Sequence, residues 1–188
     1  ANNKVVLEFD YNAYDGNGAD GVAVTFSDAG VTPVPGGYGG SLGYAQRCGI
    51  PGFAGGWLGV GIDEYGNFAN PSECRSGGTG REQDSVAIRG SGAGTTGYPY
   101  VAGTGQLSPG IDQGGGTPGP GHRYRITVDH LLGGGQAFVT VERDTTGTGN
   151  NYQEIVPEFD IFNVNPGQST VPEDWLLSFT GSTGGSTN

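Results

Sequence analysis

Eight short runs of β-branched and aromatic residues, separated by stretches rich in glycine and proline, most strongly restrict what this chain can fold into. Apolar and polar residues alternate with a period of two within several runs, and no run shows a sustained helical period. In one of them Tyr124, Ile126 and Val128 should face one way and the residues between them the other. The expected strands are 5–11, 21–27, 58–63, 85–89, 124–130, 137–143, 153–162 and 175–180.

Such alternation is typical of antiparallel sheets with one face on the core and the other face in water. We therefore expect an all-β protein built as an antiparallel β-sandwich, and 188 residues suit one domain. The three glycines at 133–135 predict a hairpin turn between two strands. The connections 28–57 and 90–122 are too long for hairpins and predict loops, where binding sites are usually found.

The charge of the chain argues against several partners. A formal net charge of −11, with only eight Lys plus Arg, provides no basic patch for a nucleic-acid backbone. No apolar run approaches the length of a membrane span. Because the sequence opens on Ala1 and polar residues and shows no signal segment, we expect a mature, soluble and exported chain.

Cys48 and Cys74 are the only two cysteines, and they bracket the expected strand 58–63. They form neither a CxxC pair nor part of a zinc-ligand cluster. We expect a structural disulfide that ties the loop before this strand to the loop after it; two buried free thiols are the alternative.

Hard oxygen ligands alternate at Asp63, Tyr65 and Asn67, directly after an apolar, strand-like run. If the strand ends there, the Asp63 carboxylate, a main-chain carbonyl near Tyr65 and the Asn67 amide converge on one point. A hard cation or a polar ligand such as a sugar would fit there. Taken alone, the segment is equally typical of a strand followed by an ordinary turn, and that interpretation is then the better one.

Separated motifs nevertheless occur together and in a fixed order. They are ADGVA at 19–23, GGSLG at 39–43, VGIDEYGN at 60–67 and a late segment, 175–184, that ends in SFTGSTG. Together they resemble the legume-type, or L-type, lectin domain of the concanavalin A-like fold, over nearly the whole chain. The segments 39–47 and 57–73 look most similar to bacterial members that are modules of surface or pilus-associated adhesins.

The resemblance implies a concanavalin A-like jelly roll and a glycan-binding site. In such lectins the aspartate at the position of Asp20 accepts hydrogen bonds from two sugar hydroxyls, as a carboxylate does best. Taken alone, Asp20 would more often be a turn residue, Tyr65 a core aromatic and the paired glycines an ordinary loop. Only their joint occurrence favours a binding site. The implied sugar-binding residues are Asp20, the main-chain amide of Gly40 or Gly39, the ring of Tyr65, the amide of Asn67, and the rim residues Gly184, Gly185 and Ser186.

The family's metal pair implies that Asp63, the Tyr65 carbonyl, Asn67 and Asn70 are metal ligands here. The chain departs from the family at three positions: Gly61 replaces a glutamate, Asn70 replaces an aspartate before a proline, and Asp84 and Ser85 stand where a histidine is expected. We therefore expect no transition metal. We expect one calcium ion, with Glu64 or Glu73 compensating for the lost charge; a metal-free site stabilised by its turn is the alternative.

Glycosidases that share this architecture need two carboxylates across the scissile bond. Of the positions that carry these carboxylates in such enzymes, only the one at Asp63 is acidic here, because Gly61, Tyr65 and Gly66 occupy the others. We therefore expect no enzyme. His122, expected in a loop, and His130, expected in a strand, belong to no recognisable catalytic set.

The sequence thus predicts a glycan-binding module of a bacterial surface adhesin. The alternative is a structural or protein-binding module that has lost metal and sugar binding. In the resembled family a further strand follows the late turn, so we expect a domain clipped at both ends from a larger protein.

Overall fold

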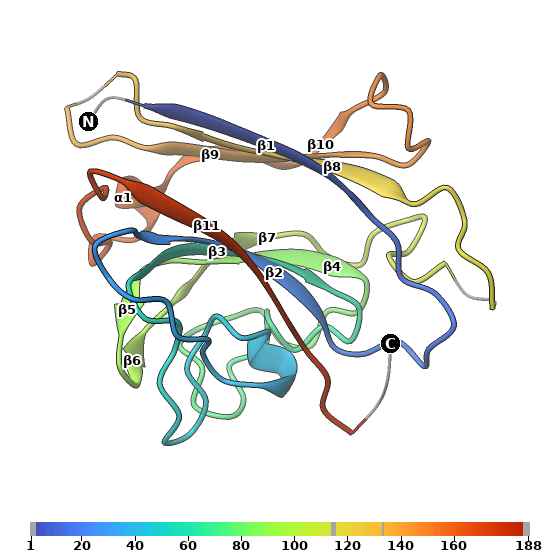
Figure 1. The fold of residues 1–188 in the computed structure, drawn as a ribbon, viewed down its shortest axis with the longest axis horizontal. Coiled ribbons are helices and arrows are strands. Elements are labelled where there is room, and N and C mark those ends of the chain that lie inside the picture. The colour runs from blue at the N-terminus through green and yellow to red at the C-terminus, as the bar shows by residue number, and fades with distance from the viewer. Residues whose placement is uncertain (1–2, 114–115, 133, 186–188) are drawn as a thin grey trace.

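Two antiparallel sheets lie one above the other in the structure, a computed structural model that describes residues 3–113, 116–132 and 134–185 (Figure 1). A four-stranded sheet has the order β1-β8-β9-β10, and a five-stranded sheet has the order β11-β2-β3-β4-β7. The strands of both sheets pair antiparallel throughout. The expected antiparallel β-sandwich is therefore confirmed.

All eight expected strands are present, with ends within two residues of the expected ones. The four-stranded sheet contains β1 (Lys4–Tyr11), β8 (His122–Asp129), β9 (Phe138–Asp144) and β10 (Gln153–Asp160). The five-stranded sheet contains β11 (Trp175–Ser182), β2 (Gly21–Asp28), β3 (Gly56–Asp63), β4 (Ser85–Arg89) and β7 (Tyr100–Gly103). The remaining elements are the hairpin β5 (Gly92–Ala93) and β6 (Thr96–Gly97), a 3-10 turn η1 (Gly39–Ser41) and a helical turn α1 (Ile161–Val164).

Two predictions about the extents of loops and strands need correction. The segment 90–122 is not all loop, because it also contains β5, β6 and β7. The strand expected at 153–162 ends at Asp160, whose carboxylate accepts the amide hydrogen of Phe162 at 3.1 Å and so starts α1. Of the predicted turn at 133–135, Gly133 lies outside the described residues. In the described part of the chain no helix is long and apolar enough to span a membrane.

The main core lies between the two sheets. Leu58, Val60 and Ile62 of β3 are fully buried there, in one cluster with Ile126 and Val128 of β8. Each such side chain contributes about 1.5–3 kcal/mol by leaving water. The alternating apolar residues of the strands thus produce the core between the two sheets.

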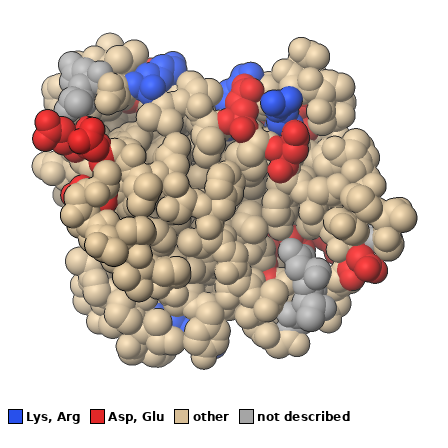
Figure 2. Space-filling model, viewed as in Figure 1, with Lys and Arg blue, Asp and Glu red and all other residues tan. Residues whose placement is uncertain are grey.

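The two sheets differ in their exposure to solvent. In the four-stranded sheet β8 alternates between buried and partly exposed residues, as expected, and its outer face carries charges. There Arg125 contacts Glu8 at 2.7 Å and Glu142 at 3.3 Å; basic groups beside acidic ones are visible at the top of Figure 2. The five-stranded sheet corrects the prediction of one wet face, because β3 and β4 are buried at every position.

The long loops cover the outer face of the five-stranded sheet and form a second apolar cluster with it. Glycines in β3 make this possible. A Cβ atom at Gly59 would lie 2.3 Å from the ring of Tyr44, and one at Gly61 would lie 2.3 Å from the ring of Phe68. The alternation of glycine with Leu58, Val60 and Ile62 therefore creates two faces, one for side chains of its own and one for aromatic rings from the loops.

His122 is the first residue of β8 and is buried, whereas His130 follows that strand, so the sequence expectation for these two residues was the wrong way round. The Nδ1 atom of His122 accepts a hydrogen bond from the Arg143 guanidinium at 2.7 Å. Burial, with the charge of Arg143 adding to it and Asp144 opposing it, lowers the pKa of His122 to about 4. The folded state therefore holds this histidine neutral.

We predict a pH-dependent loss of stability that His122 causes. Between its unfolded pKa of about 6.5 and its folded pKa of about 4, the unfolded chain binds a proton that the folded chain rejects. The contribution of His122 to the free energy of unfolding should therefore fall as the pH drops through this window, by on the order of 2 kcal/mol. Urea unfolding of wild type and H122Q across pH 4–7 measures it.

Asp63, whose raised pKa acts in the opposite direction, is present in both proteins, so wild type should lose stability relative to H122Q as the pH falls over this range. H130Q, which changes the other and more exposed histidine, should follow the wild-type curve. Parallel curves for wild type and H122Q would contradict the assignment.

Candidate functional site

A hollow of about 360 Å³ opens where the end of β11, the segment before β2, the η1 turn and the turn after β3 meet. Seven of the residues that the sequence predicts for a sugar site line it, although they come from four distant parts of the chain. Ser186 lies outside the described residues. Their sugar-binding role stays a prediction, but the structure does bring them together. The residues lining the hollow are Ala19, Asp20, Gly39, Gly40, Arg47, Tyr65, Asn67, Glu73, Gly184 and Gly185.

The main chain of Asp20 is fixed on both sides. Its carbonyl oxygen accepts the amide hydrogens of Glu64 at 3.0 Å and Tyr65 at 3.2 Å, and its own amide donates to the carbonyl of Ser182 at 3.2 Å. The peptide bond between Ala19 and Asp20 is cis. The turn after β3 and the end of β11 thus hold the residue that leads into β2.

The Asp20 carboxylate is almost buried, with 4% of the residue exposed. The Gly184 amide lies near the carboxylate and lowers its pKa, but the Oδ2 atom is buried without a hydrogen-bond partner in the described part of the chain. Burial raises the pKa of Asp20 above its ordinary value and Glu73 adds to this, while Arg75, Arg47 and the Gly184 amide oppose it. A buried acceptor without a donor is unfavourable, so this oxygen is suited to a donor from a ligand.

Gly40 and Asn67 form the floor of the hollow in close contact. A Cβ atom at Gly40 would lie only 2.2 Å from the Asn67 Cβ. The amide of the neighbouring Gly39 donates to Ser182 Oγ at 2.6 Å, which leaves Gly40 as the candidate main-chain donor. The Asn67 Oδ1 atom accepts from Asn70 Nδ2 at 3.0 Å, so the amide nitrogen of Asn67 is the group left to donate to a ligand.

Tyr65 lies at the wall of the hollow and is partly exposed. The guanidinium of Arg81 lies 3.9 Å from the centroid of its ring, and Arg81 Nε donates to the Tyr65 carbonyl at 3.0 Å. Arg81 thus covers one face of the ring. The opposite face is the one available for stacking.

Arg47 is a lining residue that the sequence does not predict, and Glu73 is predicted only as a metal ligand. The two form an ion pair at the wall, and the Arg47 guanidinium lies 4.1 Å from the centroid of the Tyr38 ring. Glu73 also binds Arg75 at 3.0 Å. A signal was present in the sequence, since arginine is scarce here and Arg47 and Arg75 each stand next to a cysteine.

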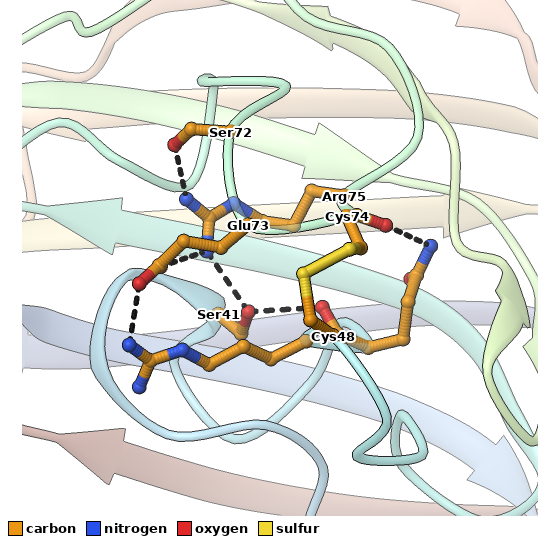
Figure 3. The surroundings of a disulfide bond; sticks show 8 residues. Ser41, Cys48, Ser72, Glu73, Cys74 and Arg75 are labelled. Atoms are coloured by element: carbon orange, nitrogen blue, oxygen red, sulfur yellow. Dashed lines mark hydrogen bonds and ion pairs between the residues drawn. A yellow bond between two sulfur atoms is a disulfide. The ribbon is translucent and has the colours of Figure 1, made fainter.

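The predicted disulfide between Cys48 and Cys74 is confirmed (Figure 3). It joins the segments that carry Arg47 and Glu73, and the amide of Cys48 also donates to the Glu73 carbonyl at 3.1 Å. Glu73 and Cys74 both have left-handed backbones, with φ of 54° and 66°, which side chains of this kind rarely adopt. The crosslink and the ion pairs hold this unfavourable conformation at the edge of the hollow. A disulfide is consistent with an extracellular protein.

Asp63, the central predicted metal ligand, is fully buried. Its Oδ1 atom accepts the Gly66 amide hydrogen at 2.7 Å, and its Oδ2 atom accepts that of Phe68. Burial raises the pKa of Asp63 to about 7, although both amide hydrogen bonds oppose the rise. Its carboxylate therefore stabilises the turn after β3 by accepting these two hydrogen bonds.

The other predicted ligand oxygens are engaged in the same way. The Tyr65 carbonyl accepts from Arg81, the Asn67 side chain accepts from Asn70, and the Asn70 side chain accepts from the Ser72 amide at 3.1 Å. Within the described residues no group of three or more acidic, histidine or cysteine side chains is arranged to hold a metal. These residues do not fit a cation in this arrangement. The calcium ion stays a prediction that these hydrogen bonds do not favour.

Comparisons with known proteins add a likeness in fold. No protein-family model matches the chain, and no curated protein matches it. Among solved structures it resembles that of peanut lectin with a nine-residue peptide, PVIWSSATG, at 19% identity and a TM-score of 0.47. The match covers 95% of this chain and 63% of the lectin chain, so the chain spans less than two thirds of that protein. The architecture itself rests on the strand pairing described above.

We predict that Gly40→Ala damages the floor of the hollow. The added methyl group would meet the Asn67 Cβ at 2.2 Å, so η1 or the turn after β3 must shift, at a cost of about 1–3 kcal/mol. Urea unfolding measures the loss. G105A is the matched control, because a Cβ at Gly105 meets nothing within 4 Å, and it should leave the unfolding free energy nearly unchanged. Equal stability of both variants would contradict the close contact.

We also predict that the double variant C48S/C74S is less stable than the oxidised wild type by about 3 kcal/mol. The crosslink closes a segment of 26 residues, and losing it frees the unfolded chain. Urea unfolding with and without a reductant measures the effect. Reduction should lower the wild-type unfolding free energy to that of the double variant and leave the double variant itself unchanged; a wild type insensitive to reduction would refute this.

Proposed function

We propose that the chain is a carbohydrate-binding domain and that the hollow at Asp20 binds a sugar residue. One observation carries the proposal: a carboxylate oxygen of Asp20 is buried at the hollow without a donor in the described part of the chain. A ligand rich in hydroxyl groups supplies such donors. A charged acceptor of this kind gains about 1.5–3 kcal/mol for each hydrogen bond it accepts.

Other groups that line the hollow also suit a sugar ligand. Asn67 and the main chain of Gly40 provide donors that line the same hollow as the Asp20 acceptor. The free face of Tyr65 provides an apolar surface for the C–H groups of the ring. Gly184 and Gly185 leave the rim open, since neither has a side chain that would fill the hollow.

Binding without hydrolysis is the better interpretation of the acidic groups. The carboxylates that line the hollow belong to Asp20 and Glu73. Partial burial raises the pKa of Glu73, but hydrogen bonds and charges from Arg75 and Arg47 outweigh it and lower the pKa overall. Asp20 has the raised pKa that a glycosidase acid needs, but hydrolysis also needs a second carboxylate that is free to act as nucleophile or base. Ion pairs with Arg47 and Arg75 occupy the carboxylate of Glu73, so it is poorly suited to that role.

The cellular role in this proposal is that of an exported module of a bacterial surface adhesin. The sequence resemblance suggests it, and the Cys48–Cys74 disulfide supports an oxidising compartment. The excess of acidic residues supports neither a nucleic acid nor an anionic membrane surface as the partner.

A glycan array followed by calorimetric titration of the sugars that bind, such as mannose or glucose, tests the proposal. Asp20→Asn keeps the size of the side chain but removes its charge and one acceptor. It should weaken binding about a hundredfold if two charged hydrogen bonds are affected. The control is Asp10→Asn on the exposed face of β1, which should bind like wild type. Silence across all sugars, or equal binding by wild type and D20N, would refute the site and favour a protein-binding module.

A further inference from the structure

The turn after β3 contains many main-chain carbonyls and predicted ligand oxygens, yet it is organised around two buried guanidinium groups. The first is Arg75, whose side chain is completely buried. Its Nε donates to the Asn70 carbonyl at 3.0 Å, its Nη1 to Ser41 Oγ at 3.1 Å and Glu73 at 3.0 Å, and its Nη2 to Ser72 Oγ at 2.9 Å. Figure 3 shows this group between the two cysteine-bearing segments.

These contacts connect both halves of the floor of the hollow. Ser41 directly follows Gly40 in η1, and Asn70, whose carbonyl Arg75 holds, binds the side chain of Asn67. One cation therefore fixes the position of the candidate main-chain donor and of the candidate side-chain donor. Its planar fork reaches acceptors in several directions at once, as a single ammonium group does not.

Arg89 in β4 supports the same turn from the sheet. It is fully buried, and it donates to the carbonyls of Phe68 at 2.8 Å, Ser76 at 2.8 Å and Gly77 at 3.1 Å. The negative charges near these arginines are those of Asp63, Glu73 and Asp20. Fixed guanidinium groups thus already supply the positive charge and the carbonyl contacts that a bound cation would provide.

We propose that Arg75 takes the place of a divalent cation as the positioning residue of the hollow, so that the turn after β3 is ordered without calcium. For ligand recognition this rests on the proposed function: sugar binding is then independent of calcium and depends on the Arg75 guanidinium. The order of the turn itself does not depend on which ligand binds.

The first experiment uses calcium alone. Protein treated with a chelator is titrated with CaCl₂ by calorimetry, and amide hydrogen exchange of Gly66 and Phe68 is followed with and without the ion. We expect no saturable heat and unchanged protection of both amides. Stoichiometric calcium binding, or slower exchange of these amides in calcium, would overturn the proposal.

The second experiment distinguishes the effect of the guanidinium's hydrogen-bonding geometry from the effect of its positive charge. Arg75→Lys keeps a positive charge but loses the fork, and Arg125→Lys makes the same change at an ion pair on the outer face of the four-stranded sheet. At a temperature where both variants are folded, R75K should speed exchange of the Gly66 and Phe68 amides and weaken sugar binding about tenfold. R125K should alter neither, and wild-type behaviour of R75K would overturn the proposal.

If R75K does not fold, Ser41→Ala provides the milder test, since it removes one Arg75 acceptor in η1. It should speed exchange of the same two amides, and unchanged exchange would count against the proposal. If wild type binds no sugar, the proposed function fails, while calcium titration and amide exchange still decide the role of Arg75.

Discussion

Burial of the central strands of the five-stranded sheet, β2, β3 and β4, on both faces is the constraint on which the rest of the structure depends. One face packs on the four-stranded sheet, and the other lies beneath Tyr44, Phe68 and other loop residues. Without this second layer the long loops would have no apolar surface to hold them, and ordering so many glycine residues is costly. The hollow is a product of the second layer, because η1 and the turn after β3 meet only where both lie on the sheet.

The sequence predicts the strands well because their cause is local. Leu58, Val60 and Ile62 alternate with glycine, and this pattern alone defines a strand with one buried face. It does not reveal that the glycine face is also buried, because the rings that cover it come from residues 44 and 68. β7 was missed for a similar reason: Tyr100–Gly103 is short, and its pairing with β4 depends on partners distant in sequence.

The candidate site was predictable in part, for a different reason. Asp20, Gly40 and Asn67 belong to short motifs whose combination indicated one site, and the structure places them around one hollow. Arg47 and Arg75 belong to no such motif. Their positions beside the two cysteines are the one signal in the sequence, but their roles depend on which carbonyls and carboxylates the fold brings within reach, and the sequence does not give these contacts. The same holds for Asp63, whose pattern indicates a ligand but whose oxygens bind the amides of its own turn.

Under the proposed function, the small size of the hollow limits how strongly one copy of the domain can hold a glycan. About 360 Å³ lies near the lower limit for ligand pockets, which leaves room for little more than a single sugar unit while the rest of a glycan extends into solvent. Contacts with one unit give weak affinity for each copy. Firm attachment to a glycan then requires several copies presented together, so that avidity, and not the individual site, sets its strength and reversibility.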